Sequence, residues 1–448
     1  MPVKKTELFS DKDLKKLILP LFMEQLLVMM VGLADTFVVS FAGEAAVSGV
    51  SLVNSFNTIF IYLFTALASG GAVIISQYIG KQASEAAGES ASQLLMASSL
   101  FSLIISILVL GVNRQLLAFL FGKVEPEVME ACVVYLKISA YSYPALAVYN
   151  AGAALYRSIG RTSTTMYISI VSNVINVVGN VIGVFVLKAG VAGVAYPSLI
   201  ARTFSAAAIT VLCFRSGKFV QYRMQWVFRW NRALLQKILN IAIPNGIENG
   251  IFQFVKVALS SVVALFGTYQ IAANGIAQSI WSMAALVCVT MGPVFITVIG
   301  QCMGAEDIPA AEYYFKRLMK ITIRISVVWN VLIFAATPLL MRWYVVEAET
   351  KRLIILLVLI HNIFNLAVFP FAGPLGNGLR AAGDVKFTML LSIASTVGGR
   401  FIFSLLFAVV LKLGVVGIAY AMCLDWAIRA VVFYIRFRSG KWKRFQVV

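Results

Sequence analysis

The chain has 448 residues, of which 60% are hydrophobic and only 12% are charged, and its mean hydropathy is +0.89. Soluble domains carry about 25% charged residues, so this composition excludes a chain that folds mainly in water and indicates an integral membrane protein. The formal net charge of +18 would suggest a nucleic-acid partner in a soluble protein. In a membrane protein, basic residues instead mark the loops on the cytoplasmic side, so we expect no nucleic-acid partner.

Apolar stretches of about 20 residues recur along the chain, and each is long enough to cross a hydrocarbon core about 30 Å thick as a helix. Because no soluble domain remains between them, the sequence predicts an all-α membrane protein with 12 transmembrane helices. The predicted spans are 17–41, 51–79, 91–113, 130–156, 166–188, 190–213, 237–266, 275–302, 318–341, 354–379, 389–411 and 413–435.

Basic residues outside the spans gather on the side that holds both termini, which predicts cytoplasmic termini and the cell inner membrane as the location. We expect a cytoplasmic N-terminal segment (1–16), an N-lobe (17–213), a cytoplasmic inter-lobe loop (214–236), a C-lobe (237–436) and a basic cytoplasmic tail (437–448). The central loop interleaves basic and aromatic side chains, an arrangement expected to lie against anionic lipid headgroups. These side chains are Arg215, Lys218, Arg223, Arg229, Arg232, Trp226 and Trp230.

The two halves of the chain repeat each other at an offset of 223 to 224 residues. LYRSIGR from Leu155 matches GLRAAGD from Gly378, LKAGVAGVAY from Leu187 matches LKLGVVGIAY from Leu411, and FRSGK occurs at both Phe214 and Phe437. Pro20 pairs with Pro244, and Glu24 pairs with Glu248, at the same offset. Because each copy holds six spans, both copies start on the same side, which predicts parallel repeats related by a pseudo-two-fold axis along the membrane normal.

Paired parallel bundles usually form a transporter with its site at their interface. The alternative is a duplicated scaffold without transport, such as a membrane sensor or a membrane enzyme. An enzyme is disfavoured, because the sole histidine is His361 and the sequence holds no HExxH, GxSxG or Cys-His set. We therefore expect neither catalytic residues nor a cofactor.

Several motifs together resemble the multidrug and toxic compound extrusion (MATE) family across the full chain, and its DinF-like more than its NorM-like branch. They are GLADTFVVSFAGEAAVSGVSL from Gly32, the two arginine-glycine motifs at Leu155 and Gly378, and NVVGNVIGVF from Asn176 followed by GVAGVAY. The resemblance implies two six-helix lobes in a V-shaped arrangement and a monomeric antiporter. It would exchange small-molecule substrates, often bulky organic cations, for sodium ions or protons. A flippase of lipid-linked saccharides with a similar fold stays open, because Arg202 and Arg400 would suit an anionic substrate.

Asp35 is the leading cation-coupling residue, since a carboxylate within a span costs about 2.5–3.5 kcal/mol to insert and is retained for function. It follows Pro20 by 15 residues, and members of the resembled family place a cation-responsive Asp at this interval. Asn176 and Asn180 stand four apart on one helix face and, with Ser198, supply neutral oxygen ligands. Sodium is therefore possible at Asp35, Asn176 and Asn180. The family often has Asp in place of Asn180, so protons stay open, as does a helix-packing role for the amides and Ser198.

Substrate contacts are expected on the first, seventh and eighth spans. Glu24 lies 11 residues before Asp35, which returns it to the same helix face about 16 Å away. Glu248 either binds substrate or pairs with Lys256. The candidate substrate-binding residues are Glu24, Gln25, Met29, Glu248, Asn249, Phe252, Gln253, Gln278 and Trp281. Pro20 and Pro244 interrupt the first and seventh spans and are the predicted hinges.

Charged residues within the last spans are expected to pair internally. Asp425 and Arg429 stand four residues apart on one helix, which favours an ion pair between them. Arg202, Arg324, Arg400 and His361 have no such partner near them in the sequence. For Arg202, packing, competition for Asp35 and contact with an anionic substrate stay open.

Overall fold

The computed structural model describes residues 8–121, 124–215, 220–342, 346–445 and 447–448. Residues 1–7 and 446 of the predicted terminal segments and 216–219 of the predicted central loop, including Lys218, lie outside this range. The regular structure within the described range is helical, as expected where lipid offers no hydrogen bonds and each segment must satisfy its own backbone. The all-α prediction is confirmed.

The chain divides into two compact units. The N-terminal unit comprises Ser10–Gly246, and the C-terminal unit comprises Ile247–Val448 together with Phe9. Phe9 belongs there because its N–H donates to the Tyr314 hydroxyl, which donates back to the Phe9 carbonyl, both over 2.8 Å. The boundary between the units falls inside one helix, shortly after Pro244.

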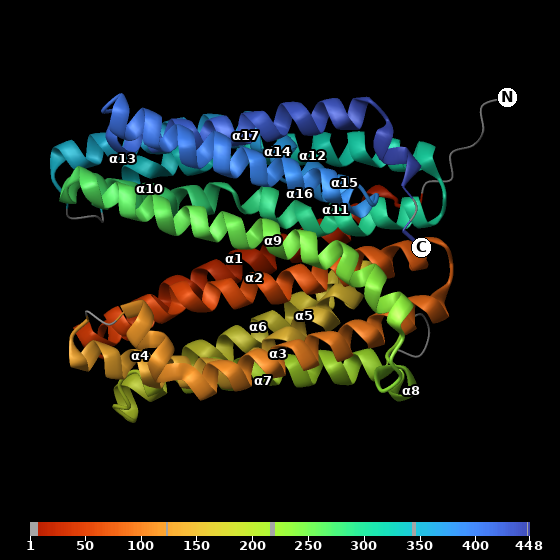
Figure 1. Cartoon of the computed structure of the whole chain (residues 1–448), viewed down its shortest axis with the longest axis horizontal. Coiled ribbons are helices and arrows are strands. Elements are labelled where there is room, and N and C mark those ends of the chain that lie inside the picture. The colour runs from red at the N-terminus through yellow and green to blue at the C-terminus, as the bar shows by residue number, and fades with distance from the viewer. Residues whose placement is uncertain (1–7, 122–123, 216–219, 343–345, 446) are drawn as a thin grey trace. The chain divides into compact units, whose positions relative to one another are not determined.

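Long helices run side by side in the N-terminal unit (Figure 1). α1 packs on α6, α6 and α5 pack on α7, and α2 packs on α3, α4 and α5. These helices are α1 (Asp11–Ser40), α2 (Glu44–Gly80), α3 (Ser84–Phe121), α4 (Pro126–Tyr141), α5 (Tyr143–Ser158), α6 (Thr162–Val181) with the π-helical η1 (Ile182–Val186), α7 (Ala192–Arg215) and the short α8 (Met224–Val227).

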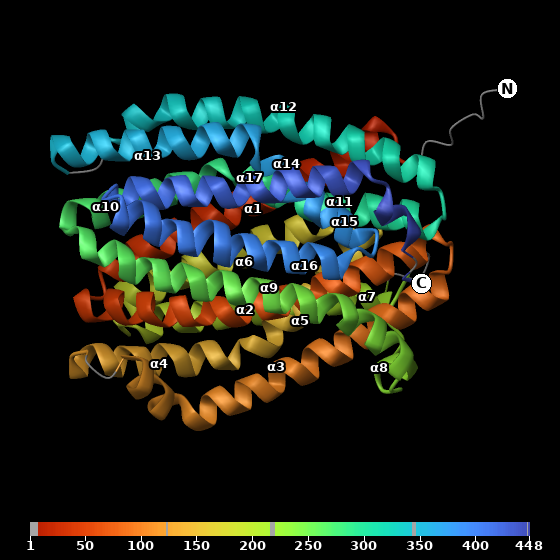
Figure 2. The same ribbon diagram turned by 45° about the horizontal axis from the view of Figure 1, so that its top comes forward.

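The following helix, α9 (Arg232–Val263), holds Pro244 and crosses the unit boundary; η2 (Ala264–Phe266) extends it. In the C-terminal unit α11 packs on α12 and α15, α10 on α13, and α17 on the π-helical segments (Figure 2). Its helices are α10 (Thr268–Ala284), α11 (Leu286–Gly304), α12 (Ile308–Leu340), α13 (Ala348–Ala367), α14 (Phe369–Ala372), α15 (Pro374–Ala381), α16 (Val385–Ala394), η3 (Ser395–Ile402), η4 (Leu405–Val410), α17 (Gly414–Arg438) and η5 (Lys441–Arg444).

The predicted spans all fall on helices of the structure. Among the described residues, 11 helices are long and apolar enough to cross a bilayer, and the pair α4 and α5 brings the number to 12 if it forms one span. That pair bends by 42°, a break that the sequence did not predict. The eighth predicted span is likewise split between α10 and α11, whereas α1 continues through Pro20 without interruption.

The duplication is visible in the backbone as well as in the sequence. Residues with positive φ, a conformation used where a helix ends and the chain turns, recur at the repeat offset even where the residue is not glycine. The related pairs are Gly43 and Gly267, Gln82 and Glu306, Gly160 and Gly383, Lys188 and Lys412, and Gly190 and Gly414. The two halves therefore turn at equivalent positions of the repeat.

The helix that carries Arg400 is one residue longer than its counterpart in the first repeat. α6 with η1 spans 25 residues, whereas its counterpart, α16 with η3 and η4, spans 26. η1 corresponds to η4, but η3 (Ser395–Ile402) has no counterpart among the described residues of the N-terminal unit. A π turn holds one residue more than an α turn, so η3 accommodates the extra residue and shifts the repeat offset from 223 to 224. Arg400 lies within this segment.

The central loop is held against α3 rather than lying free. Gln93, a fully buried residue of α3, donates to the carbonyl oxygens of Trp226 (2.6 Å) and Arg229 (2.5 Å) and accepts from the Asn231 N–H (3.1 Å). Trp226 is buried, with the Arg223 guanidinium over its ring. The expectation that Trp226 faces lipid headgroups is therefore wrong, because a buried amide ties its loop to α3; Trp230 is 64% exposed.

Candidate functional site

A chain of hydrogen bonds joins α1, α6 and α7 in the N-terminal unit. Asn180 Nδ2 donates to the Asp35 carboxylate over 2.6 Å and also to Asn176 Oδ1 over 2.8 Å. Asn176 Nδ2 donates to Ser198 Oγ over 3.0 Å, and Ser198 donates to the Val194 carbonyl over 3.2 Å. The structure thus brings the four predicted cation-coupling residues, Asp35, Asn176, Asn180 and Ser198, into one network.

The Asn180 amide has a fixed orientation in this network. A carboxylate accepts hydrogen bonds only, so the NH2 group of Asn180 must face Asp35. Asn180 is fully buried, and its Oδ1 has no hydrogen-bond partner among the described residues. A buried oxygen without a donor costs free energy unless a cation or water fills the place. The network therefore carries one carboxylate and one unsatisfied oxygen, a donor set of the kind that hard cations use.

Polar side chains continue from this network toward α2 and the bend between α4 and α5. Arg202 on α7 donates to Ser142 Oγ over 2.7 Å and acts electrostatically on the Asp35 carboxylate. Tyr143, next to that bend, donates to Asn57 Oδ1 over 2.6 Å. Ser142, the residue at which α4 and α5 break, is thus the partner of Arg202, although 60 residues separate the two in the sequence.

Glu24 is occupied by an internal ion pair. Its carboxylate lies 2.8 Å from Arg157 Nη2 and accepts from the hydroxyls of Thr165 (3.0 Å) and Tyr149 (3.3 Å). The side chain is 5% exposed. The Glu24 carboxylate is therefore fully used by partners within its own unit. The other candidates on α1, Gln25 and Met29, are half-buried.

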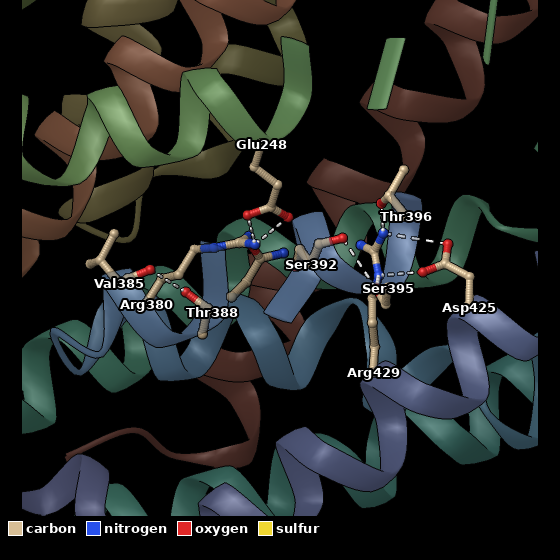
Figure 3. A network of polar contacts seen from close by, with 10 residues as sticks. Glu248, Arg380, Val385, Thr388, Ser392, Ser395, Thr396, Asp425 and Arg429 are labelled. Carbon is tan, nitrogen blue, oxygen red and sulfur yellow. Dashed lines mark hydrogen bonds and ion pairs between the residues drawn. The ribbon is translucent and has the colours of Figure 1, made fainter. Parts of the chain in front are cut away.

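Glu248 forms the repeat-related pair in the C-terminal unit. Both of its carboxylate oxygens accept from Arg380 Nη2 over 2.6 Å, and Arg380 also donates to Asn377 (Figure 3). The suggested pairing of Glu248 with Lys256 is therefore wrong, and Lys256 is exposed. Glu248 pairs with Arg380 rather than with Lys256 because Arg380 extends from α15 inside the bundle, where a buried carboxylate needs a positively charged partner.

Asp425 on α17 lies between two arginines. Arg429 Nε donates to Asp425 Oδ1 over 2.9 Å, which confirms the predicted pair, and Arg429 also donates to the hydroxyls of Ser395 and Thr396 on η3 (Figure 3). Arg400 Nε lies 3.0 Å from Asp425 Oδ2 without the alignment of a hydrogen bond. Asp425 is thus the partner of Arg400 that the sequence did not reveal.

Aromatic candidates surround the same part of α17. The rings of Trp281 and Trp426 stack with centroids 5.5 Å apart, and Phe252 lies under the Arg400 guanidinium at 4.9 Å. Gln278, one turn from Trp281, points its amide at the Met422 sulfur over 3.9 Å. The remaining candidates on α9 are Gln253, which is buried, and Asn249, which is half-buried.

Arg157 and Arg380 are the residues that sequence reasoning missed as ion-pair partners. Each is separated from its acid by more than 130 residues. A signal was nevertheless present, because Glu24 with Glu248 and Arg157 with Arg380 recur at the repeat offset. An acid and a base that are duplicated together inside apolar spans indicate a buried pair.

Comparison with known proteins matches the chain to one family along both halves. The MatE family model matches residues 20–182 and again residues 244–406, so the two copies start 224 residues apart. The chain is 28% identical to the uncharacterized transporter YisQ of Bacillus subtilis, over 94% of this chain and 93% of that protein. It is 23% identical to the probable multidrug resistance protein NorM of Thermotoga maritima, over 97% of this chain and 93% of that protein.

A solved structure gives the same result for the fold. An outward-facing multidrug resistance MATE family transporter of the MOP superfamily superimposes with a TM-score of 0.89 at 21% identity, covering 96% of this chain and 95% of that one. The similarity to the DinF-like branch stays a prediction. Because the family model covers more than half of the chain and falls on both repeats, the chain belongs to the MatE family of membrane transporters.

Proposed function

We propose that the chain is a cation-coupled antiporter that exports amphipathic organic compounds, chiefly cations, across the cell inner membrane by alternating access. In this proposal both termini are cytoplasmic, and the protein works as a monomer. The observation that carries it is the hydrogen-bonded chain from Asp35 to Ser198, whose buried Asn180 Oδ1 has no partner among the described residues.

Asp35 is the group that exchanges ions in this scheme. Among the described residues its carboxylate accepts from one neutral donor, Asn180, and Arg202, which acts on it electrostatically, donates to Ser142 instead. Glu24, Glu248 and Asp425 each face an arginine at 3.0 Å or less. An arginine already supplies the positive charge that a proton or sodium ion would bring. Among these acids, Asp35 is therefore the one best suited to bind and release a cation.

Sodium and protons both fit this arrangement. A sodium ion would take oxygens of Asp35, Asn180 and Asn176, whereas a proton would neutralise Asp35 alone and leave the amides as its hydrogen-bond partners. Coupling further requires that the cation and the exported compound prefer different conformations, because a ligand with equal affinity for both shifts neither. Pro20 and Pro244 are the hinges we propose for that change.

The test is ethidium efflux from membrane vesicles under imposed sodium and proton gradients. We expect Asp35→Asn to fold and insert normally but to lose gradient-driven efflux. The matched control is Glu44→Gln, which neutralises an exposed acid at the start of α2 and should leave efflux unchanged. Wild-type efflux by Asp35→Asn would remove Asp35 from the coupling mechanism.

A further inference from the structure

The charges around Asp425 do not balance. Two guanidinium groups, Arg400 and Arg429, share this single carboxylate, and arginine remains protonated at any relevant pH. The three side chains are nearly buried, with exposed fractions of 8% for Arg400, 14% for Arg429 and 0% for Asp425. The group therefore keeps a net charge of +1 within the membrane-spanning helices, where charged groups normally pair.

Arg400 is the less satisfied of the two arginines. Arg429 donates to Asp425, Ser395 and Thr396, so its guanidinium is largely used. Arg400 approaches Asp425 without hydrogen-bond alignment and has the Phe252 ring against its guanidinium. The charged groups that act most strongly on it are Asp425 and Arg429 themselves. Arg400 thus carries the surplus positive charge, and its Nε–H makes no hydrogen bond to the described residues.

Two further donors beside this cluster have no acceptor in the described part of the chain. Trp281 stacks on Trp426, the residue after Asp425, and its buried Nε1–H has no partner among the described residues. His361 is 1% exposed and lies with its ring 6.4 Å from that of Trp426, and neither of its ring nitrogens has a partner in the ranges that the structure describes. Both rings therefore lie beside Trp426. Buried donors left unpaired are costly, so their grouping indicates a place for an acceptor.

We propose that Arg400, with Trp281 and His361, binds the anionic group of an aromatic amphipathic substrate, for example a carboxylate. An anion would neutralise the surplus charge of the cluster and accept from its unpaired donors. The aromatic body of the substrate would pack on Trp281 and Trp426. The position within η3 agrees with this role, because isolated π-helical segments occur frequently at functional sites. The inference rests on the proposed export function and extends its substrates from cations to zwitterions and anions.

The experiment compares two dyes that differ by one carboxylate, rhodamine B and its ethyl ester. Purified full-length protein in lipid nanodiscs is titrated with each dye at neutral pH, without any ion gradient, and binding is followed by fluorescence anisotropy. We expect the wild type to bind the free acid at least about tenfold more tightly than the ester, the effect typical of one charge-assisted hydrogen bond. Equal affinity of the wild type for the two dyes would overturn the proposal.

Arg400→Gln should abolish the preference for the acid while the ester binds with wild-type affinity, because Asp425 keeps its pair with Arg429. The matched control, Lys256→Gln, removes an exposed positive charge from α9 in the same unit and should keep the preference. Trp281→Phe removes one donor but keeps the ring, so we expect a smaller reduction. If Arg400→Gln does not fold, an unchanged preference in Trp281→Phe would overturn the proposal.

The same titrations in chloride and in gluconate buffer separate a substrate carboxylate from a solvent anion. If chloride is the natural ligand, both dyes will depend on chloride and the acid will have no advantage, which contradicts the proposal. The binding measurement is also independent of coupling. A failure of the Asp35 experiment would leave the preference for the acid intact, so the two hypotheses can fail separately.

Discussion

The N-terminal and C-terminal units share a scaffold but differ in polarity at equivalent positions. In the N-terminal unit, Asp35 accepts a hydrogen bond from Asn180 of α6. At the repeat offset of 224, Asp35 corresponds to Leu259 and Asn180 corresponds to Ser404. At the same offset, Asn176 corresponds to Arg400. The C-terminal unit thus has no acid at the position equivalent to Asp35, and it carries an arginine on η3 where the N-terminal unit has an asparagine.

Other polar features are the same in both units. The ion pairs Glu24–Arg157 and Glu248–Arg380 occur at the same place in each repeat, 2.8 Å and 2.6 Å long. We infer that features shared by the two repeats hold the bundles together, whereas features found in one repeat only carry transport. In the proposed mechanism, the cation therefore binds in the N-terminal unit and the substrate in the C-terminal unit.

The largest effect on stability should come from breaking either shared ion pair. Arg157→Leu and Arg380→Leu each leave a buried carboxylate without its base, which costs about 3–5 kcal/mol. The loss should be similar for both variants and measurable as thermal unfolding of the purified protein in detergent. Glu85→Gln is the control, because it breaks an exposed 3.5 Å pair with Arg223, leaves Arg223 over the Trp226 ring and should change stability by less than about 1 kcal/mol. A neutral effect in one unit would show that the shared pair does not stabilise that unit.

A smaller effect, on the rate of efflux, is expected to differ between alanine variants of Asn180 and of its counterpart Ser404. Asn180→Ala removes the donor to Asp35, and losing one hydrogen bond of about 1 kcal/mol should reduce efflux about fivefold when the ion gradient is limiting. Ser404→Ala should leave efflux within about twofold, because the Ser404 hydroxyl makes no hydrogen bond to the described residues. Initial rates of ethidium efflux at several sodium concentrations and pH values measure both. Equal loss in the two variants would assign Asn180 to helix packing.

The sequence predicted those parts of the molecule that depend on local pattern or on the repeat. The spans follow from apolar length, the duplication from matching segments, and the Asp425–Arg429 pair from a spacing of four residues on one helix. The group of Asp35, Asn176, Asn180 and Ser198 followed from helix spacing together with the family resemblance. Each of these inferences needs only neighbours along a helix or an equivalent position in the other half.

The features that escaped prediction depend on contacts between distant segments. Arg400 meets Asp425 across two helices. The bend at Ser142 was missed although Pro144 stands in the first turn of α5, a position at which proline often opens a helix. Trp226 looked like an interfacial residue because its loop is basic, yet the buried Gln93 side chain binds its backbone. Hydrophobic pattern locates a helix but does not tell which polar side chain of one helix will face which polar side chain of another.

Counterflow measures the central claim most directly. Vesicles loaded with ethidium and diluted into dye-free medium contain an outward substrate gradient, and the cation that moves in return is followed with a sodium isotope and with a pH-sensitive dye. We expect wild-type protein to drive sodium or protons against the ethidium flow, and Asp35→Asn to bind ethidium but move neither ion. Cation counterflow by Asp35→Asn at the wild-type ratio to ethidium would contradict the account.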